Sequence, residues 1–318
     1  MSQFYLRAWN ITIGGLGTFA TDGIRVRFSI KQGTVHSPNN ATVRLTNNLR
    51  SAAEAFCKNP GSIGQPVTIS AGYSGDAGIL FKGHVAWPIY GRENPTDTLT
   101  TIFCTDGHLA TSHATVSKTF PPGSTPKDHL NLAIQSFQKY AVNLGFIGQG
   151  VDLSQPVYPR SVTLFGMAKK VVEDIAKSKG ATWGIQNLLV NILKPSDSIP
   201  GAYDLNSATG MIGMPTLAPE GVYVRSLINS QLIVDGLVHI DQSAIQGYLP
   251  QTNPVTGDVL GGYNYNTDSK LIAHIAADGI YRIVKIDVEA DSRGQPWYMD
   301  MLVLKPGDTT PVSIDYGT

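Results

Sequence analysis

The chain has 318 residues, of which 42% are hydrophobic and only 15% are charged, below the roughly one quarter that is usual for soluble proteins. Basic and acidic residues number 24 each, so the formal net charge is zero, and no overall field favours binding to nucleic acid or acidic membranes. With two cysteines in the chain a disulfide scaffold is excluded, and Cys57 and Cys104 are expected to be buried free thiols.

The first part of the chain is predicted to consist of β-strands. From Gly23 to Asn48, apolar and polar residues alternate, pause at a polar turn and alternate again, which indicates a half-buried antiparallel pair. The apolar face carries Ile24, Val26, Phe28, Ile30, Ala41, Val43 and Leu45. The polar face carries Arg25, Arg27, Lys31 and Arg44. Further alternating runs with Gly- and Pro-rich turns follow, typical of a meander that closes into a barrel or sandwich.

Helices are predicted in the middle of the chain. Thr125, Pro126 and Asp128 form a capping-box-like start, and apolar residues at helical spacing follow. A second amphipathic helix is expected over 163–180, where Gly180 fits the position just after its end.

The period of two returns at Ala181. Residues 181–195 are predicted as one strand, 221–241 as two strands and 279–306 as a hairpin. The order is therefore β, α, β, a pseudo-repeat of architecture without a repeat in sequence. Gln242 to Asp278 is rich in Gly, Tyr, Asn and Thr, and a loop of that length is usually functional or mobile.

Motifs for catalysis are weak. Gly15, Gly17 and Ala20 match a dinucleotide-binding fingerprint, but a strand follows where that fold needs a helix, so a hairpin turn is the better interpretation. His108 and His113 lack zinc-ligand spacing, and no carboxylate pair or nucleophile elbow indicates a hydrolase. The sequence therefore predicts no catalytic residue, no cofactor and no metal site.

Three stretches, in their order and spacing, resemble one family. They are "IRVRFSIKQ…NNATVRLTNN", then "LFGMAKKVVEDIAKSKGATWGIQNLLVNI", then "GMPTLAPEGVYVRSLINSQLIVDGLVHID" with the later "GIYRIVKIDVEADSRGQPWYMDMLVL". Together they are similar to the baseplate hub protein of contractile-tailed bacteriophages, which is related to the base of type VI secretion spikes and to other contractile injection hubs. The resemblance extends from Ile24 to Leu304, and the 242–278 segment is a departure from it.

The resemblance implies a mainly β fold with α (α+β), in which two tube-like antiparallel β-barrel domains are joined by a helical connector. The expected divisions are 1–120 for the first barrel domain, 121–180 for the connector and 181–318 for the second barrel domain, with 242–278 as an insertion loop.

The implied function is structural rather than enzymatic. Such hubs are homotrimers whose six barrels adapt the hexameric tail tube to the trimeric central spike. The expected partners are the tail tube protein, the spike protein, other baseplate proteins and the tape measure protein, with DNA only passing through the central channel. The protein is expected in the virion tail baseplate after assembly in the host cytoplasm. No signal peptide and no apolar run long enough to cross a membrane is seen, so no membrane insertion is expected.

Two alternatives remain open. The protein could be another tail component, such as a receptor-binding protein whose 242–278 segment contacts a cell surface, or a cell-wall hydrolase. On the hub hypothesis, the basic face of the first strand pair is a contact surface, and Arg25, Arg27, Lys31 and Arg44 are the candidates for contacts between subunits.

Overall fold

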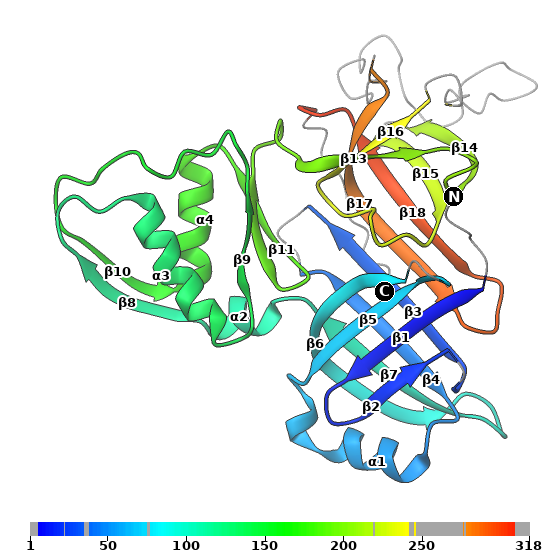
Figure 1. Cartoon of the computed structure of the whole chain (residues 1–318). Helices are drawn as coiled ribbons and strands as arrows, with labels where there is room; N and C mark the ends of the chain where they lie inside the picture. Colours follow the sequence, from blue (N-terminus) through cyan, green and yellow to red (C-terminus); the bar gives the residue numbers. More distant parts are fainter. Residues whose placement is uncertain are drawn as a thin grey trace, which may run out of the picture.

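The computed structural model describes residues 6–308 except 22, 35–37, 75–76, 219, 242–244, 246–275 and 277. The predicted 242–278 segment therefore lies almost wholly outside the described residues. Most of the described chain is β-structure, as the alternating sequence pattern predicted (Figure 1).

The elements fall into three consecutive groups. The first β half contains β1 (Arg7–Ile13), β2 (Gly17–Ala20), β3 (Val26–Gly33), β4 (Asn40–Thr46), α1 (Arg50–Lys58), β5 (Pro66–Tyr73), β6 (Gly78–Arg92) and β7 (Thr98–Thr105). The helical unit contains α2 (His108–His113), β8 (Thr115–Phe120), α3 (Pro126–Gln138), β9 (Asn143–Ile147), β10 (Val162–Met167), α4 (Ala168–Ser178), β11 (Thr182–Gln186) and β12 (Leu189–Leu193). The second β half contains β13 (Ile199–Leu205), β14 (Met211–Ala218), β15 (Gly221–Leu227), β16 (Gly236–Ile240), β17 (Ile280–Asp291) and β18 (Trp297–Leu304).

Both β halves belong to one curled sheet of 13 strands. Its main path runs β14-β15-β18-β17-β3-β4-β7-β6-β5-β1-β2, and β16 and β13 branch from β17. The halves are joined by antiparallel pairing of β17 with β3, from Lys285 opposite Gly33 to Asp291 opposite Arg27. One apolar core lies beneath both halves. The expectation of a mainly β fold with helices is confirmed, and its two β parts share a continuous sheet.

The strand order of the first β half recurs in the second. In the first half the order is β3-β4-β7-β6-β5-β1, and in the second it is β14-β15-β18-β17-β16-β13. If β2 is left out, each half has six strands that can be numbered in chain order. The order of these numbers across the sheet is then the same in both halves. The long strands β6 and β17 also shift register at the same place, after Val85 and after Ile283. One pairing differs, because β13 runs parallel to β16 whereas β1 runs antiparallel to β5. The predicted pseudo-repeat is thus present in the topology.

The strand pair β3–β4 has the faces that its alternation predicted. Val26, Phe28 and Ile30 are buried, as are the apolar residues of β4. The Phe28 ring meets Trp297 of β18 edge to face, with ring centroids 5.9 Å apart, an arrangement that is favourable beyond the area it buries. A side chain of the first half is therefore packed directly against the second.

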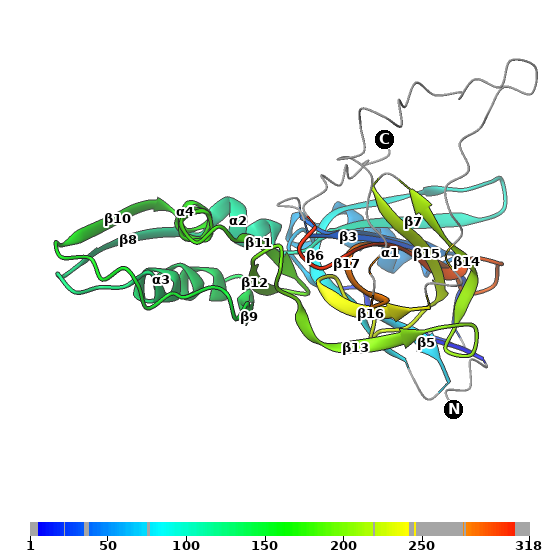
Figure 2. The same ribbon diagram turned by 90° about the horizontal axis from the view of Figure 1, so that it is seen from above.

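The helical unit has an apolar core of its own and projects to one side of the sheet (Figure 2). The capping box at Thr125 and Asp128 is confirmed. The second helix is shorter than predicted, because residues 162–167 form β10 and pair with β8. Gly166, with φ of +127°, lies outside the helical region of backbone space, so the helix begins only at Ala168.

Residues 181–195 form a hairpin of two strands, β11 and β12, rather than one strand. Asn187 and Leu188 both have positive φ, 55° and 66°, a conformation that non-glycine residues seldom adopt. The predicted single strand was wrong because Asn187 is the one turn-forming residue in "QNLL", and the leucine after it seldom adopts a positive φ. Buried side chains of both strands pack in the core of the helical unit.

Tertiary contacts hold this turn against the first β half. The backbone N–H groups of Asn187 and Leu188 donate to the Asp106 carboxylate over 2.6 and 2.9 Å. The Asn39 amide donates to the carbonyl of Ile185 over 2.9 Å, and the Asn187 side chain accepts from the backbone N–H of Lys82. Asp106 is buried, and burial raises its pKa to about 7 despite those two donors.

Several smaller elements were not predicted. They are β2, α2, β8, β9, β13 and β14. Both cysteines are free thiols, as expected; Cys104 is buried, but Cys57 is only partly buried, because it lies on the short surface helix α1.

Replacing Phe28 by alanine is expected to lower the free energy of unfolding by about 3–5 kcal/mol, because it leaves a cavity where the two β halves meet. Replacing Arg27 by alanine should cost less than about 1 kcal/mol, since its ion pair is partly exposed. Urea denaturation of both variants checks this. Equal losses would show that the faces of β3 are assigned wrongly.

The raised pKa of Asp106 predicts a pH dependence. Its carboxyl is harder to ionise when folded than when unfolded, so its contribution to stability is greatest below about pH 4 and is lost as the pH rises through about 7. Denaturation from pH 4 to 8 should show this decline. The decline in stability should be smaller in Asp106→Asn. The control is Asp235→Asn, which removes a second buried carboxyl with pKa about 6 and should leave the decline due to Asp106 unchanged. Identical pH profiles for the wild type and Asp106→Asn would refute the assignment.

Candidate interaction surface

The four basic residues predicted as contacts lie together on the solvent side of β3 and β4. Arg27 and Arg44 are direct neighbours across the pair, and Lys31 lies opposite Asn40. Arg25 immediately precedes β3. The structure thus gathers them on one face, as the sequence predicted, and adds partners from the second β half that the sequence did not reveal.

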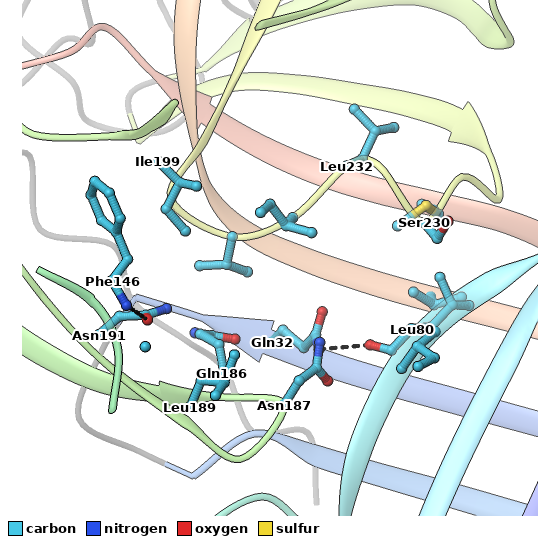
Figure 3. Close-up of a pocket in the computed structure, with 16 residues that line it drawn as sticks. Gln32, Leu80, Phe146, Gln186, Asn187, Leu189, Asn191, Ile199, Ser230 and Leu232 are labelled. Carbon is cyan, nitrogen blue, oxygen red and sulfur yellow. Dashed lines mark hydrogen bonds between the residues drawn. The ribbon is translucent and has the colours of Figure 1, made fainter. Parts of the chain in front are cut away.

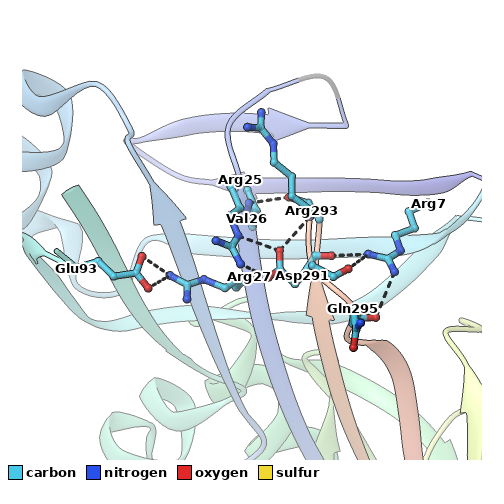
Figure 4. A network of polar contacts seen from close by, with 10 residues as sticks. Arg7, Arg25, Val26, Arg27, Glu93, Asp291, Arg293 and Gln295 are labelled. Carbon is cyan, nitrogen blue, oxygen red and sulfur yellow. Dashed lines mark hydrogen bonds and ion pairs between the residues drawn. The ribbon is translucent and has the colours of Figure 1, made fainter. Parts of the chain in front are cut away.

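Arg25 is held at the junction of the two halves (Figure 4). Its guanidinium donates to both oxygens of Asp291, over 3.2 Å from Nε and 2.6 Å from Nη2. Arg7 donates to the Asp291 carbonyl over 2.8 Å. Beside them, Val26 and Ser292 exchange two hydrogen bonds of 2.9 and 2.8 Å. The loop between β17 and β18 is therefore fastened to the start of β3.

The Asp291 carboxylate is the charge at the centre of this network. Burial alone would raise the pKa of Asp291, but the hydrogen bond from Arg25 and the backbone N–H groups of Arg293 and Gly294 together lower it below its usual value. Asp291 is therefore ionised at neutral pH, and its hydrogen bonds to Arg25 join the two halves across 266 positions of sequence.

The other basic residues differ in how far they are already paired. Arg27 donates from Nη2 to both oxygens of Glu93, over 2.6 and 2.7 Å. Arg44 is exposed, and within the described part of the chain it has neither an ion pair nor a side-chain hydrogen bond. Lys31 faces Asp287 across the β3–β17 pairing, and that carboxylate is 2.8 Å from the ammonium of Lys285. Arg44 is thus the most available of the four for contact with another chain.

Charges on the second half are likewise matched. Arg225 donates to both oxygens of Asp300 over 2.7 and 2.8 Å, and its guanidinium lies 4.1 Å from the ring centroid of Tyr298. The Tyr298 hydroxyl donates to Glu289 over 2.8 Å. The face that runs across β4, β3, β17, β18 and β15 is therefore polar with mostly compensated charge.

Two parts of the sheet expose large apolar side chains instead. On β6 and β7, Trp87, Ile89 and Phe103 are exposed, with Trp87 directly opposite Phe103. On β14, Ile212 and Met214 are exposed. Concentrations of this kind mark surfaces that are covered by a partner. Sequence reasoning missed them because they follow the same alternating pattern as solvent-facing strands.

A cavity of about 350 Å³ opens where the two β halves and the helical unit meet (Figure 3). No charged side chain is among the described residues that line it. The side-chain amides that line the cavity are largely hydrogen-bonded to the backbone. Gln32 donates to the Leu80 carbonyl over 3.0 Å, and Asn191 accepts from the Phe146 N–H over 2.8 Å. Among the described residues that line it, Ser230 has a hydroxyl, but none is a histidine or a carboxylate that could act as its base.

The described residues contain no group of three or more potential metal ligands. They also contain no helix that is both long and apolar enough to pass through a membrane.

Solved structures of tail proteins match this chain over nearly its whole length. A tail protein from Neisseria meningitidis matches with a TM-score of 0.57 and 9% sequence identity, covering 96% of this chain and 99% of its own. The 43 kDa tail protein of prophage MuSo2 from Shewanella oneidensis matches with a TM-score of 0.52 and 12% identity, covering 95% and 99%. The chain has the fold of a phage tail protein.

A third match links this fold to secretion machines. An Escherichia coli component of the type VI secretion system, described as structurally similar to the T4 bacteriophage tail proteins gp27 and gp5, matches with a TM-score of 0.53 and 10% identity, covering 97% of this chain and 78% of its own. The resemblance to baseplate hub proteins is confirmed at the level of fold. No protein-family model and no curated protein sequence matches the chain.

Replacing Asp291 by alanine is expected to lower the free energy of unfolding by about 1.5–3 kcal/mol at neutral pH, because it removes buried hydrogen bonds to a charged group. Asp300→Ala is the matched control, since it breaks an exposed pair that contributes less than about 1 kcal/mol.

Because the pKa of Asp291 is lowered by folding, the contribution of its carboxylate to stability is present above the unfolded pKa and is lost as the pH falls through the folded pKa. The difference between Asp291→Ala and wild type, measured by denaturation, should therefore shrink in acid. A difference that is constant down to strong acid would contradict this role.

Proposed function

We propose that this protein is the structural hub of a phage tail, a homotrimer that joins the hexameric tail tube to the trimeric central spike. The observation that carries the proposal is the recurrence of one strand order in the two β halves. A chain with two equivalent halves presents six similar surfaces when three copies surround an axis. A strand order that occurs twice in one chain is what a threefold-to-sixfold adaptor needs.

The fold comparisons support the tail assignment, because the matched proteins are described as tail proteins or as a secretion component similar to tail proteins. In the proposed assembly each β half acts as one tube-like domain, within 1–120 and 181–318, and the helical unit lies between them in sequence. The role is structural, and the protein belongs to the virion tail baseplate.

The electrostatics support passage rather than capture of DNA. The net charge is zero, and Arg25, Arg27 and Arg225 are each paired with a carboxylate of the same chain. Tight nucleic-acid binding depends on many uncompensated cations. A channel lined by such surfaces lets DNA and the tape measure protein pass without holding them. The other proposed partners are the tail tube protein, the spike protein and neighbouring baseplate proteins.

The test is the symmetry of the assembled particle. The chain is mixed with its tail tube and spike proteins, and the complex is examined by electron microscopy and mass measurement. We expect three copies around a central channel, with the two β halves of each copy related by a rotation of about 60°. A single copy per particle, or a peripheral position on the tail, would refute the hub function and favour a receptor-binding role.

A further inference from the structure

The cavity between the two β halves and the helical unit has a buried floor and an open mouth. Its floor contains Leu232, Val288 and Met299, which are at most 3% exposed. Ile79 and Leu189 also line it but are 43% and 42% exposed, so the cavity opens to solvent. Its volume of about 350 Å³ lies within the range of pockets that hold ligands, roughly 300–1,000 Å³.

One wall of this cavity is polar and the opposite wall is apolar (Figure 3). The polar wall carries Gln186, Asn187 and Asn191, all from the hairpin of β11 and β12. Ile199 and Leu232 lie on the other side. A ligand with an apolar body and a polar group can therefore contact both walls at the same time.

Two amides of the cavity are buried but only half hydrogen-bonded. Gln32 is 9% exposed and Asn191 is 6% exposed. Each makes one hydrogen bond to the backbone, through Gln32 Nε2 and through Asn191 Oδ1. Gln32 Oε1 and Asn191 Nδ2 have no hydrogen-bond partner in the part of the chain that the structure describes, and both atoms retain accessible surface. They therefore face the cavity, where a ligand with matching groups removes the cost of leaving buried polar atoms unpaired.

The free atoms define the chemistry that fits this cavity. Asn191 Nδ2 is a donor and Gln32 Oε1 is an acceptor. Asn187 adds a second donor, Nδ2, because its Oδ1 already accepts from the backbone N–H of Lys82. A peptide group has one carbonyl and one N–H, so it matches both kinds of atom. A charged ligand is disfavoured, because no described lining residue is charged and a buried charge without a partner is costly.

The polar wall is held in place by the chain itself. Gln186 uses both ends of its amide, since it donates to the Gly33 carbonyl over 2.9 Å and accepts from the Asn39 amide over 2.7 Å. A Cβ atom at position 145 would collide with Asn191 Oδ1, so Gly145 allows that amide to lie against β9. A site that is fixed in this way loses little conformational freedom on binding.

We propose that the cavity binds an uncharged apolar segment of another protein. One branched or aromatic side chain of the segment lies against the apolar wall, and the adjacent peptide group bonds to Gln32 and Asn191. The proposal rests on the proposed function, because a neighbouring tail protein is the source of the segment. Since both β halves and the helical unit line the cavity, an occupant also stabilises their arrangement.

Titration of the full-length chain with N-acetyl-leucinamide tests the chemistry of the site, because this probe has a branched side chain, amide groups and no charge. In methyl NMR spectra, the isoleucines that line the cavity, Ile79, Ile199 and Ile233, should shift and saturate, while Ile212 on β14 should not. N-acetyl-leucine should bind at least about tenfold more weakly, because its carboxylate would be buried without a partner.

A third probe, 3-methylbutan-1-ol, has the same branched chain without an amide and should also bind more weakly than N-acetyl-leucinamide. Equal binding of the alcohol would show that the amides of the cavity do not select a peptide group. The absence of any saturable shift would show that the cavity holds water only. Either result would overturn the proposal.

Filling the cavity gives the matched variants. Ile199→Trp should abolish the shifts of Ile79 and Ile233, because the larger ring occupies the site. Ile212→Trp is the control, since Ile212 is exposed and does not line the cavity, and it should bind the probe like the wild type. Leu189→Trp blocks the open mouth and replaces Ile199→Trp if that variant lowers the denaturation midpoint. Unchanged binding in the blocking variants would place the probe elsewhere and overturn the site.

Photo-cross-linking in the assembled particle identifies the source of the segment. A benzophenone amino acid at position 189, at the mouth of the cavity, should link to an uncharged apolar segment of another tail protein, which mass spectrometry maps. Particles with three copies around the axis that show no such link, or links only within the same chain, would overturn this inference and leave the hub function standing. A chain that binds the probe but does not assemble would support the site and overturn the hub function.

Discussion

The pairing of β17 with β3 is the interaction on which the rest of the structure depends, because it makes one sheet out of two β halves. The backbone ladder is reinforced on both faces of the sheet. Beneath it, Phe28 packs against Trp297, and at its end Asp291 binds Arg25 and Arg7. Without this junction each half would be a smaller sheet with an additional open edge, and the spacing of the two halves would be undefined.

Much of the local structure follows from the sequence. The alternation in β3 and β4 predicted which side chains are buried, and the capping box at Thr125 predicted where α3 begins. The turn at Asn187 and Leu188 could not be predicted, because its positive φ angles are held by Asp106, a residue far away in the sequence that follows β7. Similarly, residues 163–167 have helical spacing, but pairing with β8 makes them a strand.

For the candidate contact residues, too, the face of the strand pair could be predicted from the sequence, but partners distant in the sequence could not. The sequence placed Arg25, Arg27, Lys31 and Arg44 on one polar face correctly. It could not show that Arg25 is committed to Asp291, because the two are 266 positions apart. It also gave no sign that Trp87 and Met214 are exposed, because strands with exposed and with covered outer faces share the same alternation. Strand order, which carries the argument for function, becomes visible only in three dimensions.

The long reach of the β3–β17 pairing has a consequence for how the protein is made. A ribosome completes the first β half well before residues 285–291 are synthesised, so the β3 edge is without its partner for most of translation. A nascent edge of this kind can pair with neighbouring nascent chains, and contacts that are so distant in sequence form slowly. Lys31 and Arg25 lie along this edge, and their like charges on every copy hinder two incomplete chains from joining there.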